Sequence, residues 1–286
     1  MTRMVQIEAP CKINLHLRVL PPRPDGYHGI QSIFQRISLA DTVQIDRCYP
    51  EGLCKLECEA MDLPQDNTIT RAVSLFRSVT GVAEGLRITL TKRVPAGAGL
   101  GGGSSDAAAT LLGLNRLFDE RLSLAELERL ALAIGSDVPF FLGSPAAIVT
   151  GRGECIESMP PRSDMWGVLI WPSCHSSTAQ AYRLVDGWKD SRTDWPDVAD
   201  LPGLYRAPVS RWSSFGNSFT APLEAAFPVI ADARRAIERA GAQYTAMSGS
   251  GSTVFGLFDS EAASETAVSR LSENWGYCVK FLLLAS

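Results

Sequence analysis

The sequence lacks the features that direct a chain to a membrane or to nucleic acid. Its longest apolar stretch, "VPFFLGSPAAIV", is short and interrupted by Gly, Ser and Pro, and the N-terminal residues contain no uninterrupted apolar segment. It has no Lys/Arg block, and a formal net charge of −4 with three histidines gives no general attraction to anionic partners. We therefore expect a cytoplasmic protein that binds small molecules, with no membrane or nucleic acid partner.

Cysteine is present, but not in the spacing of a disulfide framework or a zinc site. The count of seven is odd, no C-x-x-C pair occurs, and no histidine lies near Cys54 and Cys58 to complete a metal site. We expect reduced cysteines, most of them packed in the interior.

The 286 residues, 45% of them hydrophobic and 20% charged, are sufficient for two domains around two cores. Alternating or apolar patterns predict strands at residues 5–20, 32–46, 53–60, 85–95, 166–172 and 277–284. Helical patterns occur at residues 67–81, 104–118, 123–135, 223–240 and 261–273. Residues 186–215 are rich in Trp, Asp and Pro and show no clear periodicity. Strands and helices in the second half indicate an α+β layer sandwich.

The most informative stretch is "PAGAGLGGGSSDAAA", residues 95–109, which has five glycines at positions 97–103. It follows a predicted strand and precedes a predicted helix, for which Ser104 or Ser105 is the expected N-cap. Glycine lets backbone N–H groups approach a ligand, and a helix N-terminus favours negative charge. This combination is typical of a phosphate site.

Two familiar phosphate motifs do not fit this stretch. A dinucleotide fingerprint matches from Gly97 to Gly102, but it needs a later strand that carries an acid, and residues 104–118 read as helix. A Walker A loop ends in Gly-Lys-Ser/Thr, and Ser104 directly follows Gly103. A flexible linker is also disfavoured, because a strand and a helix flank the glycines.

The pattern Pro-x3-Gly-Leu-Gly-x-Gly-Ser-Ser resembles the phosphate loop of the GHMP small-molecule kinases. The pieces "APCKINLHL", "RPDGYHGIQSIFQ", "IGSDVPFFL", "GRGE" and "MSGSGSTVFGLF" extend the resemblance over most of the chain. The motif "DGYH" resembles the corresponding motif of one branch of these kinases, the branch that phosphorylates 4-diphosphocytidyl-2-C-methyl-D-erythritol on the non-mevalonate route to isoprenoid precursors. Cys11 stands where this branch usually has Ala, and the late turn contains Ser248 and Ser250, where Thr-Gly is common.

The resemblance implies a fold and a domain division. We expect an α+β, two-domain GHMP kinase fold, with a ribosomal-protein-like N-terminal α/β domain at residues 1–163 and a ferredoxin-like C-terminal α+β domain at residues 164–286. It also implies an active site in the cleft between them. The state of association stays open between monomer and homodimer.

The resemblance implies two catalytic residues, with Asp137 as the base for the acceptor hydroxyl and Lys12 as the cation that stabilises the transferred charge. From the residues alone, Asp137 is equally an N-cap for a short helix at Pro139. Lys12 shares a strand face with Asn14, which also fits a solvated polar face. The resemblance assigns Asn14 to orienting the acceptor hydroxyl or the carboxylate.

For the acceptor, the resemblance implies that Tyr27 stacks on cytosine, that His28 hydrogen-bonds it, and that Tyr182 closes the other side. Packing of Tyr27 and His28 against the domain is the alternative. For ATP, the resemblance implies a larger set of residues: Asn67, Lys92, Pro95, Gly97, Gly99, Leu100, Gly101, Gly102, Gly103, Ser104 and Ser105.

Mg²⁺ is expected with ATP, and the sequence identifies no certain ligand for it. Ser105 is a candidate, whereas Asp106 fits a first-turn acid that favours the helix dipole. Lys92 also fits a surface charge at a strand end. Another GHMP kinase of a small alcohol and a non-catalytic nucleotide binder remain rival hypotheses. "DGYH" argues against the first, and the presence of both Lys12 and Asp137 argues against the second.

Overall fold

The structure is a computed structural model that describes residues 3–189 and 192–285, so residues 190 and 191 of the unperiodic segment lie outside it. The chain divides into two compact units. Unit 1 comprises Met1–Cys11, Leu39–Ala96 and Gly101–Gly143, and unit 2 comprises Lys12–Ser38, Gly97–Leu100 and Ser144–Ser286. The predicted domain boundary after residue 163 stays a prediction.

Two long strands, β1 (Met4–Pro22) and β2 (His28–Tyr49), contribute to both units, and they contain the strands predicted at residues 5–20 and 32–46. In unit 1, the second half of β2 pairs antiparallel with β4 (Gly85–Thr91), and β4 pairs parallel with β3 (Cys54–Glu57). A parallel pair needs a crossover connection, which α1 (Thr68–Thr80) provides.

Two helices of unit 1, α1 and α3, end where the sequence indicates. Gly81 terminates α1 with a left-handed φ of 70°, and Gly135 terminates α3 (Leu124–Ile134). At the start of α3, the Glu126 carboxylate accepts hydrogen bonds from the Ser123 N–H and hydroxyl at 2.8 and 2.7 Å. A short 3-10 helix, η1 (Pro139–Leu142), follows α3.

The predicted N-cap of the helix after the glycines is wrong. α2 (Gly102–Leu117) begins inside the glycine run, and its N-cap is Gly101 with a left-handed φ of 69°. Glycine adopts this conformation without steric cost, so the helix needs no serine to start it. The Ser105 hydroxyl instead donates to the Pro10 carbonyl at 2.8 Å.

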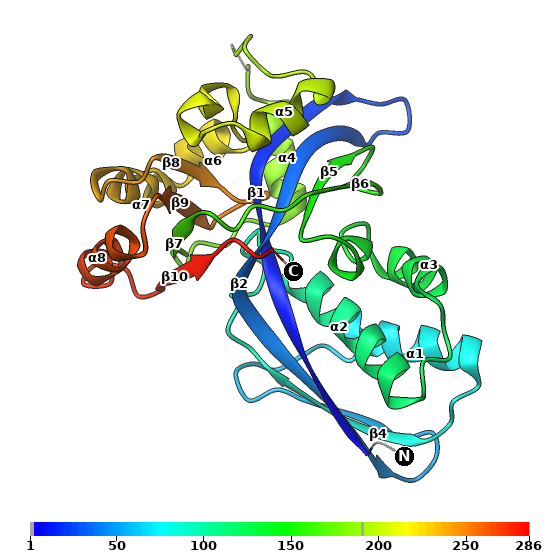
Figure 1. Ribbon diagram of the computed structural model, residues 1–286. Helices are drawn as coiled ribbons and strands as arrows, with labels where there is room; N and C mark the ends of the chain where they lie inside the picture. Colours follow the sequence, from blue (N-terminus) through cyan, green and yellow to red (C-terminus); the bar gives the residue numbers. More distant parts are fainter. Residues whose placement is uncertain (1–2, 190–191, 286) are drawn as a thin grey trace. The chain divides into compact units, whose positions relative to one another are not determined.

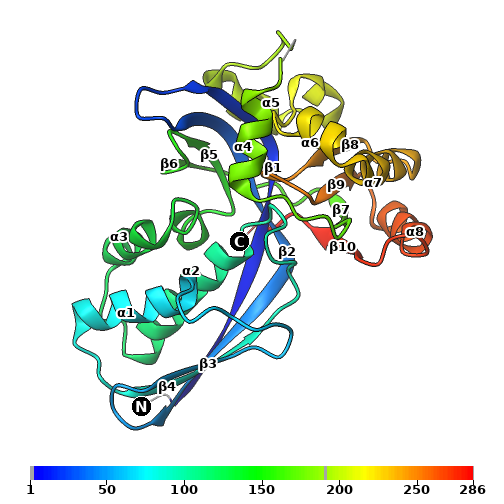
Figure 2. The ribbon, with the colours of Figure 1, turned by 180° about the vertical axis from the view of Figure 1, so that it is seen from behind.

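Helix α2 packs closely on the strands of unit 1. A Cβ on Gly113 would lie 2.9 Å from Ile45 Cδ1 and 3.3 Å from Ile7 Cγ1, so a side chain at this contact would require the two isoleucine side chains to shift. α1 and α3 pack against α2 in turn, and α1 and α2 lie along the same side of the strands in both views (Figure 1 and Figure 2). Unit 1 is therefore a layer of helices on a layer of strands.

Unit 2 contains two sets of strands. The first half of β2 pairs antiparallel with β5 (Ala146–Thr150), which pairs with β6 (Cys155–Met159). A second, antiparallel sheet has the order β10-β7-β9-β8. Its strands are β7 (Trp166–Ile170), β8 (Tyr244–Met247), β9 (Val254–Phe258) and β10 (Cys278–Leu282).

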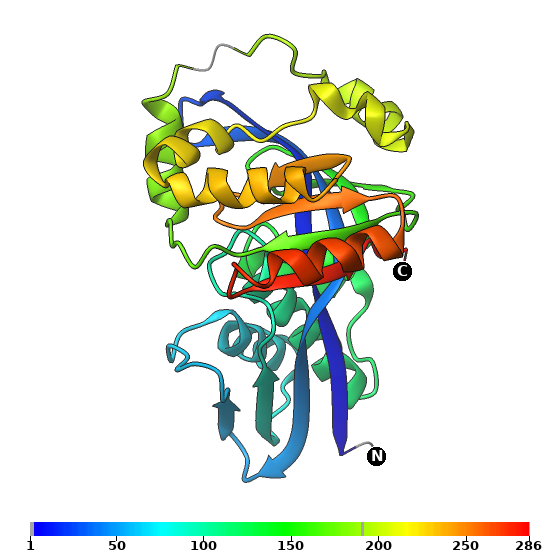
Figure 3. The same cartoon turned by 90° about the vertical axis from the view of Figure 1, so that its left-hand side faces the viewer.

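Two helices, α7 (Pro228–Arg239) and α8 (Glu261–Leu271), pack on the second sheet and lie on one side of it (Figure 3). The chain order β7-α7-β8-β9-α8-β10, with this strand order, is the ferredoxin-like arrangement. The helix predicted at residues 223–240 is in fact two helices, α6 (Thr220–Ala226) and α7, separated at Phe227. Pro228 explains the break, because the residue before a proline disfavours helical backbone.

The unperiodic segment forms only short elements, together with α4 (Thr178–Asp186) just before it. These are η2 (Val198–Asp200), α5 (Leu201–Arg206) and η3 (Val209–Ser214). Tyr205 and Trp212 are each only 1% exposed. The Tyr205 hydroxyl donates to Gln35 Oε1 at 2.6 Å, and the Trp212 indole donates to the Leu204 carbonyl at 2.7 Å. Buried aromatic side chains with satisfied polar tips therefore hold this segment in place.

All seven cysteines are free. The expectation that most of them are packed in the interior is wrong, because only Cys11 is buried, whereas Cys48 and Cys155 are exposed and the other four are partly exposed. Within residues 3–189 and 192–285, no three His, Cys, Asp or Glu side chains gather in a way that could hold a metal ion. No helix in the same ranges combines the length and apolar character needed to cross a bilayer.

Candidate active site

In unit 2, the glycine loop lies directly against a second glycine turn. Gly97 and Gly99 have φ values of 65° and 81°, which residues other than glycine rarely adopt. A Cβ on Gly99 would lie 2.1 Å from the Ser248 carbonyl oxygen, and one on Gly249 would lie 2.8 Å from the Gly99 carbonyl oxygen. Glycine is therefore required here twice over, for its backbone angle and for the close approach of two backbones.

Lys12 and Asn14 are buried beside this loop, so the solvated-face interpretation is wrong. Lys12 is 4% exposed and Asn14 is 2% exposed. The Lys12 ammonium donates to Asn14 Oδ1 at 2.6 Å and to the Gly99 carbonyl at 3.3 Å. It also lies 4.6 Å from the centre of the Phe34 ring. These contacts hold a positive charge against the backbone of the glycine loop.

Asn14 is itself fixed by hydrogen bonds on either side. Its Nδ2 donates to Ser32 Oγ at 2.9 Å, and its backbone N–H donates to Ser248 Oγ at 3.2 Å. The Ser248 hydroxyl in turn donates to the Gly99 carbonyl at 2.9 Å. Ser248 thus links the strand that carries Lys12 to the glycine loop. We did not identify it from the sequence, where it is one serine of a glycine turn.

Asp137 lies in unit 1, in the turn between α3 and η1, and is partly exposed. The N-cap of η1 is Val138, with helical backbone angles and no capping side chain. The capping interpretation of Asp137 is therefore wrong. Its role as the base, and its predicted partnership with Lys12, stay predictions.

Asn67 and Thr68 begin α1 close to the start of α2. Asn67 Oδ1 accepts from the N–H groups of Ile69 and Thr70 at 3.0 and 3.1 Å, and Nδ2 donates to the Pro64 carbonyl at 2.7 Å. The Thr68 hydroxyl donates to the Gly103 carbonyl at 2.7 Å. Asn67 is therefore a helix N-cap, and its predicted contact with ATP stays a prediction.

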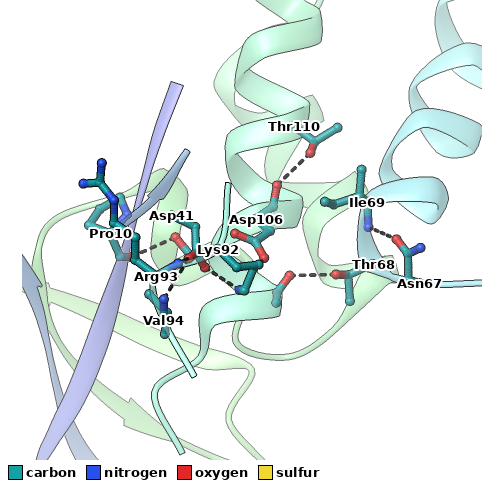
Figure 4. Close-up of polar contacts among 12 residues, drawn as sticks. Pro10, Asp41, Asn67, Thr68, Ile69, Lys92, Arg93, Val94, Asp106 and Thr110 are labelled. Atoms are coloured by element: carbon teal, nitrogen blue, oxygen red, sulfur yellow. Dashed lines mark hydrogen bonds and ion pairs between the residues drawn. The ribbon is translucent and has the colours of Figure 1, made fainter. Parts of the chain in front are cut away.

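Lys92 lies between two carboxylates in the interior of unit 1, so the surface-charge interpretation is wrong. Its ammonium donates to Asp41 Oδ2 and, at 3.1 Å, to Asp106 Oδ2 (Figure 4). Burial disfavours its charged form, but the two carboxylates outweigh burial and raise the pKa of Lys92. Lys92 remains a predicted ATP-binding residue, now with a defined charge environment.

Asp106 is not the exposed first-turn acid that the helix pattern suggests. It lies one turn inside α2 and is 3% exposed. Burial, opposed by the Lys92 charge and reinforced by Asp41, raises the pKa of the Asp106 carboxyl to about 7. Asp41 was missed by the sequence analysis, although it falls on the same strand face as the buried Val43 and Ile45. A carboxylate in phase with apolar residues is a signal that could have identified it.

The predicted Mg²⁺ ligand, Ser105, is already hydrogen-bonded within unit 1. The Ser105 hydroxyl is bonded to Pro10, and Asp106 is paired with Lys92. Mg²⁺ keeps several water ligands and commonly binds through substrate phosphates. The requirement for Mg²⁺, bound together with ATP, stays a prediction.

The predicted acceptor residues gather in unit 2. Tyr27 is 59% exposed in the turn after β1, with the Arg152 guanidinium 5.2 Å from its ring centre. His28 stacks on Tyr182 at 5.3 Å between ring centres and at an angle of 26°. Its Nδ1 donates to the Leu20 carbonyl at 2.7 Å, because a carbonyl can only accept. Its Nε2 lies 2.9 Å from Asp186.

The contacts of His28 limit how it can meet a ligand. Both ring nitrogens have partners within the protein, so the imidazole is fixed in place by its own unit. Tyr27 offers an open ring face, whereas the packing alternative requires a covered one. The structure thus brings the three predicted residues into one region, and their contacts with cytosine stay predictions.

Comparison with known proteins defines the class to which this chain belongs. The model of the GHMP kinases N terminal domain matches residues 67–144, and that of the GHMP kinases C terminal domain matches residues 204–276. The chain is therefore a GHMP kinase by both its sequence and its fold.

Similar proteins of known name identify the family within this class. The chain is 44% identical over 287 residues to the 4-diphosphocytidyl-2-C-methyl-D-erythritol kinase of Treponema pallidum (strain Nichols), with 98% of each protein covered. It is 36% identical to the enzyme of that name from Pelobacter propionicus, covering 96% of this chain and 97% of the relative. A crystal structure of 4-(cytidine 5'-diphospho)-2C-methyl-D-erythritol kinase superposes with a TM-score of 0.82 at 33% identity, covering 98% and 99% of the two chains. The chain belongs to the family of 4-diphosphocytidyl-2-C-methyl-D-erythritol kinases.

Proposed function

We propose that this protein transfers the γ-phosphoryl group of ATP to the 2-hydroxyl of 4-diphosphocytidyl-2-C-methyl-D-erythritol, a step in the non-mevalonate synthesis of isoprenoid precursors. The activity is that of its relatives at 44% and 36% identity over nearly full length. The glycine loop and the buried cation beside it support the assignment from the structure.

One observation carries the proposal. Among the described residues, no side chain caps the N-terminus of α2, because its N-cap is Gly101. The first N–H groups of a helix lack intrahelical partners and attract anions. The first N–H groups of α2 directly follow the glycine loop, whose glycines carry no side chains of their own to cover the backbone. This arrangement of N–H groups suits the β- and γ-phosphates of ATP.

Lys12 supplies the charge stabilisation in this proposal. Its ammonium, held by Asn14 Oδ1 and the Gly99 carbonyl, provides a positive charge that does not need to reorganise during the reaction. Such preorganised charge stabilises the oxygens of a phosphoryl group in transfer. Bound Mg²⁺ would neutralise charge on the ATP phosphates.

Asp137 acts as the general base. It takes the proton of the acceptor 2-hydroxyl as that oxygen forms its bond to the γ-phosphorus, and ADP leaves with the electron pair of the broken bond. The proton ends on the Asp137 carboxylate and the new phosphate monoester on the acceptor. Asn14, fixed by Ser32 and Ser248, orients the acceptor hydroxyl.

The cytidine part of the acceptor selects the substrate. Tyr27 presents an exposed ring on which a base can stack, and Tyr182 lies against His28 in the same unit. Stacking on an aromatic face contributes about 1–3 kcal/mol per base. We propose a cytoplasmic enzyme and leave the choice between monomer and homodimer open.

The test is ADP release with four acceptor conditions: the cytidine diphosphate substrate, mevalonate, homoserine and no acceptor. We expect turnover with the first alone and a loss of about 10²-fold or more in kcat for Asp137→Asn. Equal rates with and without the cytidine substrate would contradict the proposal. Near-normal kcat in Asp137→Asn would remove the base assignment and leave the substrate assignment in place.

A further inference from the structure

A short segment of unit 2, Gly216–Phe219, has contacts with both of the regions that the proposed function assigns to substrates. It lies between η3 and α6, directly after the unperiodic segment. Two of its side chains are buried, since Asn217 is 8% exposed and Phe219 is 2% exposed. All the residues that it contacts below belong to unit 2 as well. Neither Asn217 nor Phe219 has a role in the proposed function.

The backbone of this segment is attached to β1. The Gly216 carbonyl accepts from the Leu17 N–H at 2.8 Å, and the Ser218 N–H donates to the Leu17 carbonyl at 2.8 Å. Leu17 and Asn217 thus form a parallel bridge. The backbone of Asn217 is therefore fixed on the strand that carries the buried lysine of the site.

The side chain of Asn217 holds the second glycine turn, residues 247–251. Its Nδ2 donates to the carbonyls of Met247 and Gly249, both at 2.8 Å. These two hydrogen bonds use both N–H bonds of the amide. Its Oδ1 accepts from the Phe219 N–H at 2.9 Å. The amide therefore fixes the carbonyl groups on either side of Ser248.

Ser248 connects the second glycine turn to the glycine loop. Its hydroxyl donates to the Gly99 carbonyl at 2.9 Å and accepts from the Asn14 N–H at 3.2 Å. The Gly99 carbonyl also accepts from the Lys12 ammonium at 3.3 Å. Because the backbones of Gly99 and Ser248 are in close contact, a displacement of the turn would displace the loop and an acceptor of Lys12.

Phe219 lies on the other side of the segment, against Tyr182. The two ring centres are 5.0 Å apart and the rings are nearly perpendicular, at 88°. This edge-to-face geometry is one that aromatic pairs favour. Tyr182 also stacks on His28 at 5.3 Å. The orientation of the Tyr182 ring is therefore determined by a perpendicular ring and by a nearly parallel one.

We propose that Asn217 and Phe219 are positioning residues for the two substrates. Asn217 acts through Ser248 and holds the second glycine turn against the loop that receives ATP. Phe219 acts through Tyr182 and holds its ring at the place of the cytosine. This inference rests on the proposed function for the identity of the two ligands. Two residues of one short segment therefore affect the binding of different substrates.

Calorimetric titration tests the role of Asn217. Asn217→Asp keeps the shape of the side chain and the acceptor for the Phe219 N–H, but it places an oxygen opposite two carbonyl oxygens. We expect the Kd of a non-hydrolysable ATP analogue to rise about tenfold or more, while the Kd of the acceptor changes less. Asn217→Ala removes the same donors without adding charge and should also raise the analogue Kd. An increase in Asn217→Asp alone, or in neither variant, would overturn this role.

Gln35 of β2 provides the matched control for Asn217. Gln35 is fully buried in unit 2. Its Nε2 donates to the carbonyls of Arg36 and Leu284, both at 3.0 Å, and its Oε1 accepts from the Tyr205 hydroxyl. Gln35→Glu therefore makes the same exchange of an amide for an acid and should lower Tm to a similar extent. We expect both Kd values to stay near those of wild type. An analogue Kd raised as much as in Asn217→Asp would show a general loss of stability instead.

The role of Phe219 is tested with the same two ligands. Phe219→Leu keeps an apolar side chain but removes the ring that contacts Tyr182. We expect the Kd of 4-diphosphocytidyl-2-C-methyl-D-erythritol to rise about 2- to 10-fold, while the Kd of the ATP analogue stays near that of wild type. Phe281 of β10, which is 1% exposed in the same unit, provides the control. Phe281→Leu should lower Tm and leave both Kd values near those of wild type.

The two variants together decide the proposal. Asn217→Asp should weaken mainly the nucleotide, and Phe219→Leu should weaken mainly the acceptor. Equal changes for both ligands in each variant would overturn the proposal. Since these titrations need no turnover, the expected pattern of Kd values without ADP release would refute the proposed function and leave the two positioning roles in place.

Discussion

Replacement of Gly99 by alanine tests the close backbone approach in the glycine loop. Gly99 has a φ of 81°, and an added Cβ would lie 2.1 Å from the Ser248 carbonyl oxygen. The left-handed backbone costs a non-glycine residue about 1–2 kcal/mol, and overpacking adds about 1–3 kcal/mol. We expect Gly99→Ala to lower the free energy of unfolding by about 2–5 kcal/mol.

Gly52 provides the matched control. Its φ is 80°, and no atom lies within 4 Å of the position that a Cβ would occupy, so Gly52→Ala carries the backbone cost alone. Urea unfolding of both variants isolates the contact with Ser248, and Gly52→Ala should lose only about 1–2 kcal/mol. The KM for ATP should rise in Gly99→Ala and stay unchanged in Gly52→Ala. Equal losses of stability in the two variants would refute the close approach.

Two further predictions concern β1 and the turn that follows it. Burial, aided by the charges of Arg192 and Arg18, lowers the pKa of His16 to about 3. The unfolded chain therefore binds a proton that the folded protein excludes, and stability is lost as pH falls below about 6.5. Urea unfolding at pH 7 and at pH 5 should show that, between these pH values, the free energy of unfolding falls by about 2 kcal/mol more in wild type than in His16→Phe. Equal decreases in the two proteins would mean that His16 is accessible to solvent in the folded state. Tyr27→Ala should raise the acceptor KM about 5- to 150-fold in steady-state assays without changing Tm, and an unchanged acceptor KM would exclude stacking on this ring.

The sequence predicts the regular elements well where local chemistry determines them. The strand alternation from residue 5 to 20 lies within β1, and Gly81 and Gly135 end their helices as expected. Each of these signals depends on residues a few positions apart. The same local reasoning fails at Ser104, because it does not show that the helix has already begun at Gly102.

The site is less predictable, because its contacts join residues far apart in the sequence. The glycine pattern indicates a phosphate loop, but not that Gly99 meets the backbone of Ser248. The sequence indicates a surface charge at Lys92, because it does not show that β2 places Asp41 beside this lysine in the folded protein. The segment at residues 186–215 shows no hydrophobic periodicity in its sequence. Single buried aromatic residues such as Tyr205, rather than an amphipathic face, fix this segment to the rest of its unit.

The most direct test of the proposed function is the ³¹P NMR spectrum of the product formed from ATP and 4-diphosphocytidyl-2-C-methyl-D-erythritol. We expect a new phosphate monoester resonance that is coupled to carbon 2 of an acceptor labelled there with ¹³C, the diphosphate resonances of the acceptor retained, and one ADP formed for each product. Release of inorganic phosphate without a new monoester, or a monoester on a different hydroxyl, would contradict it.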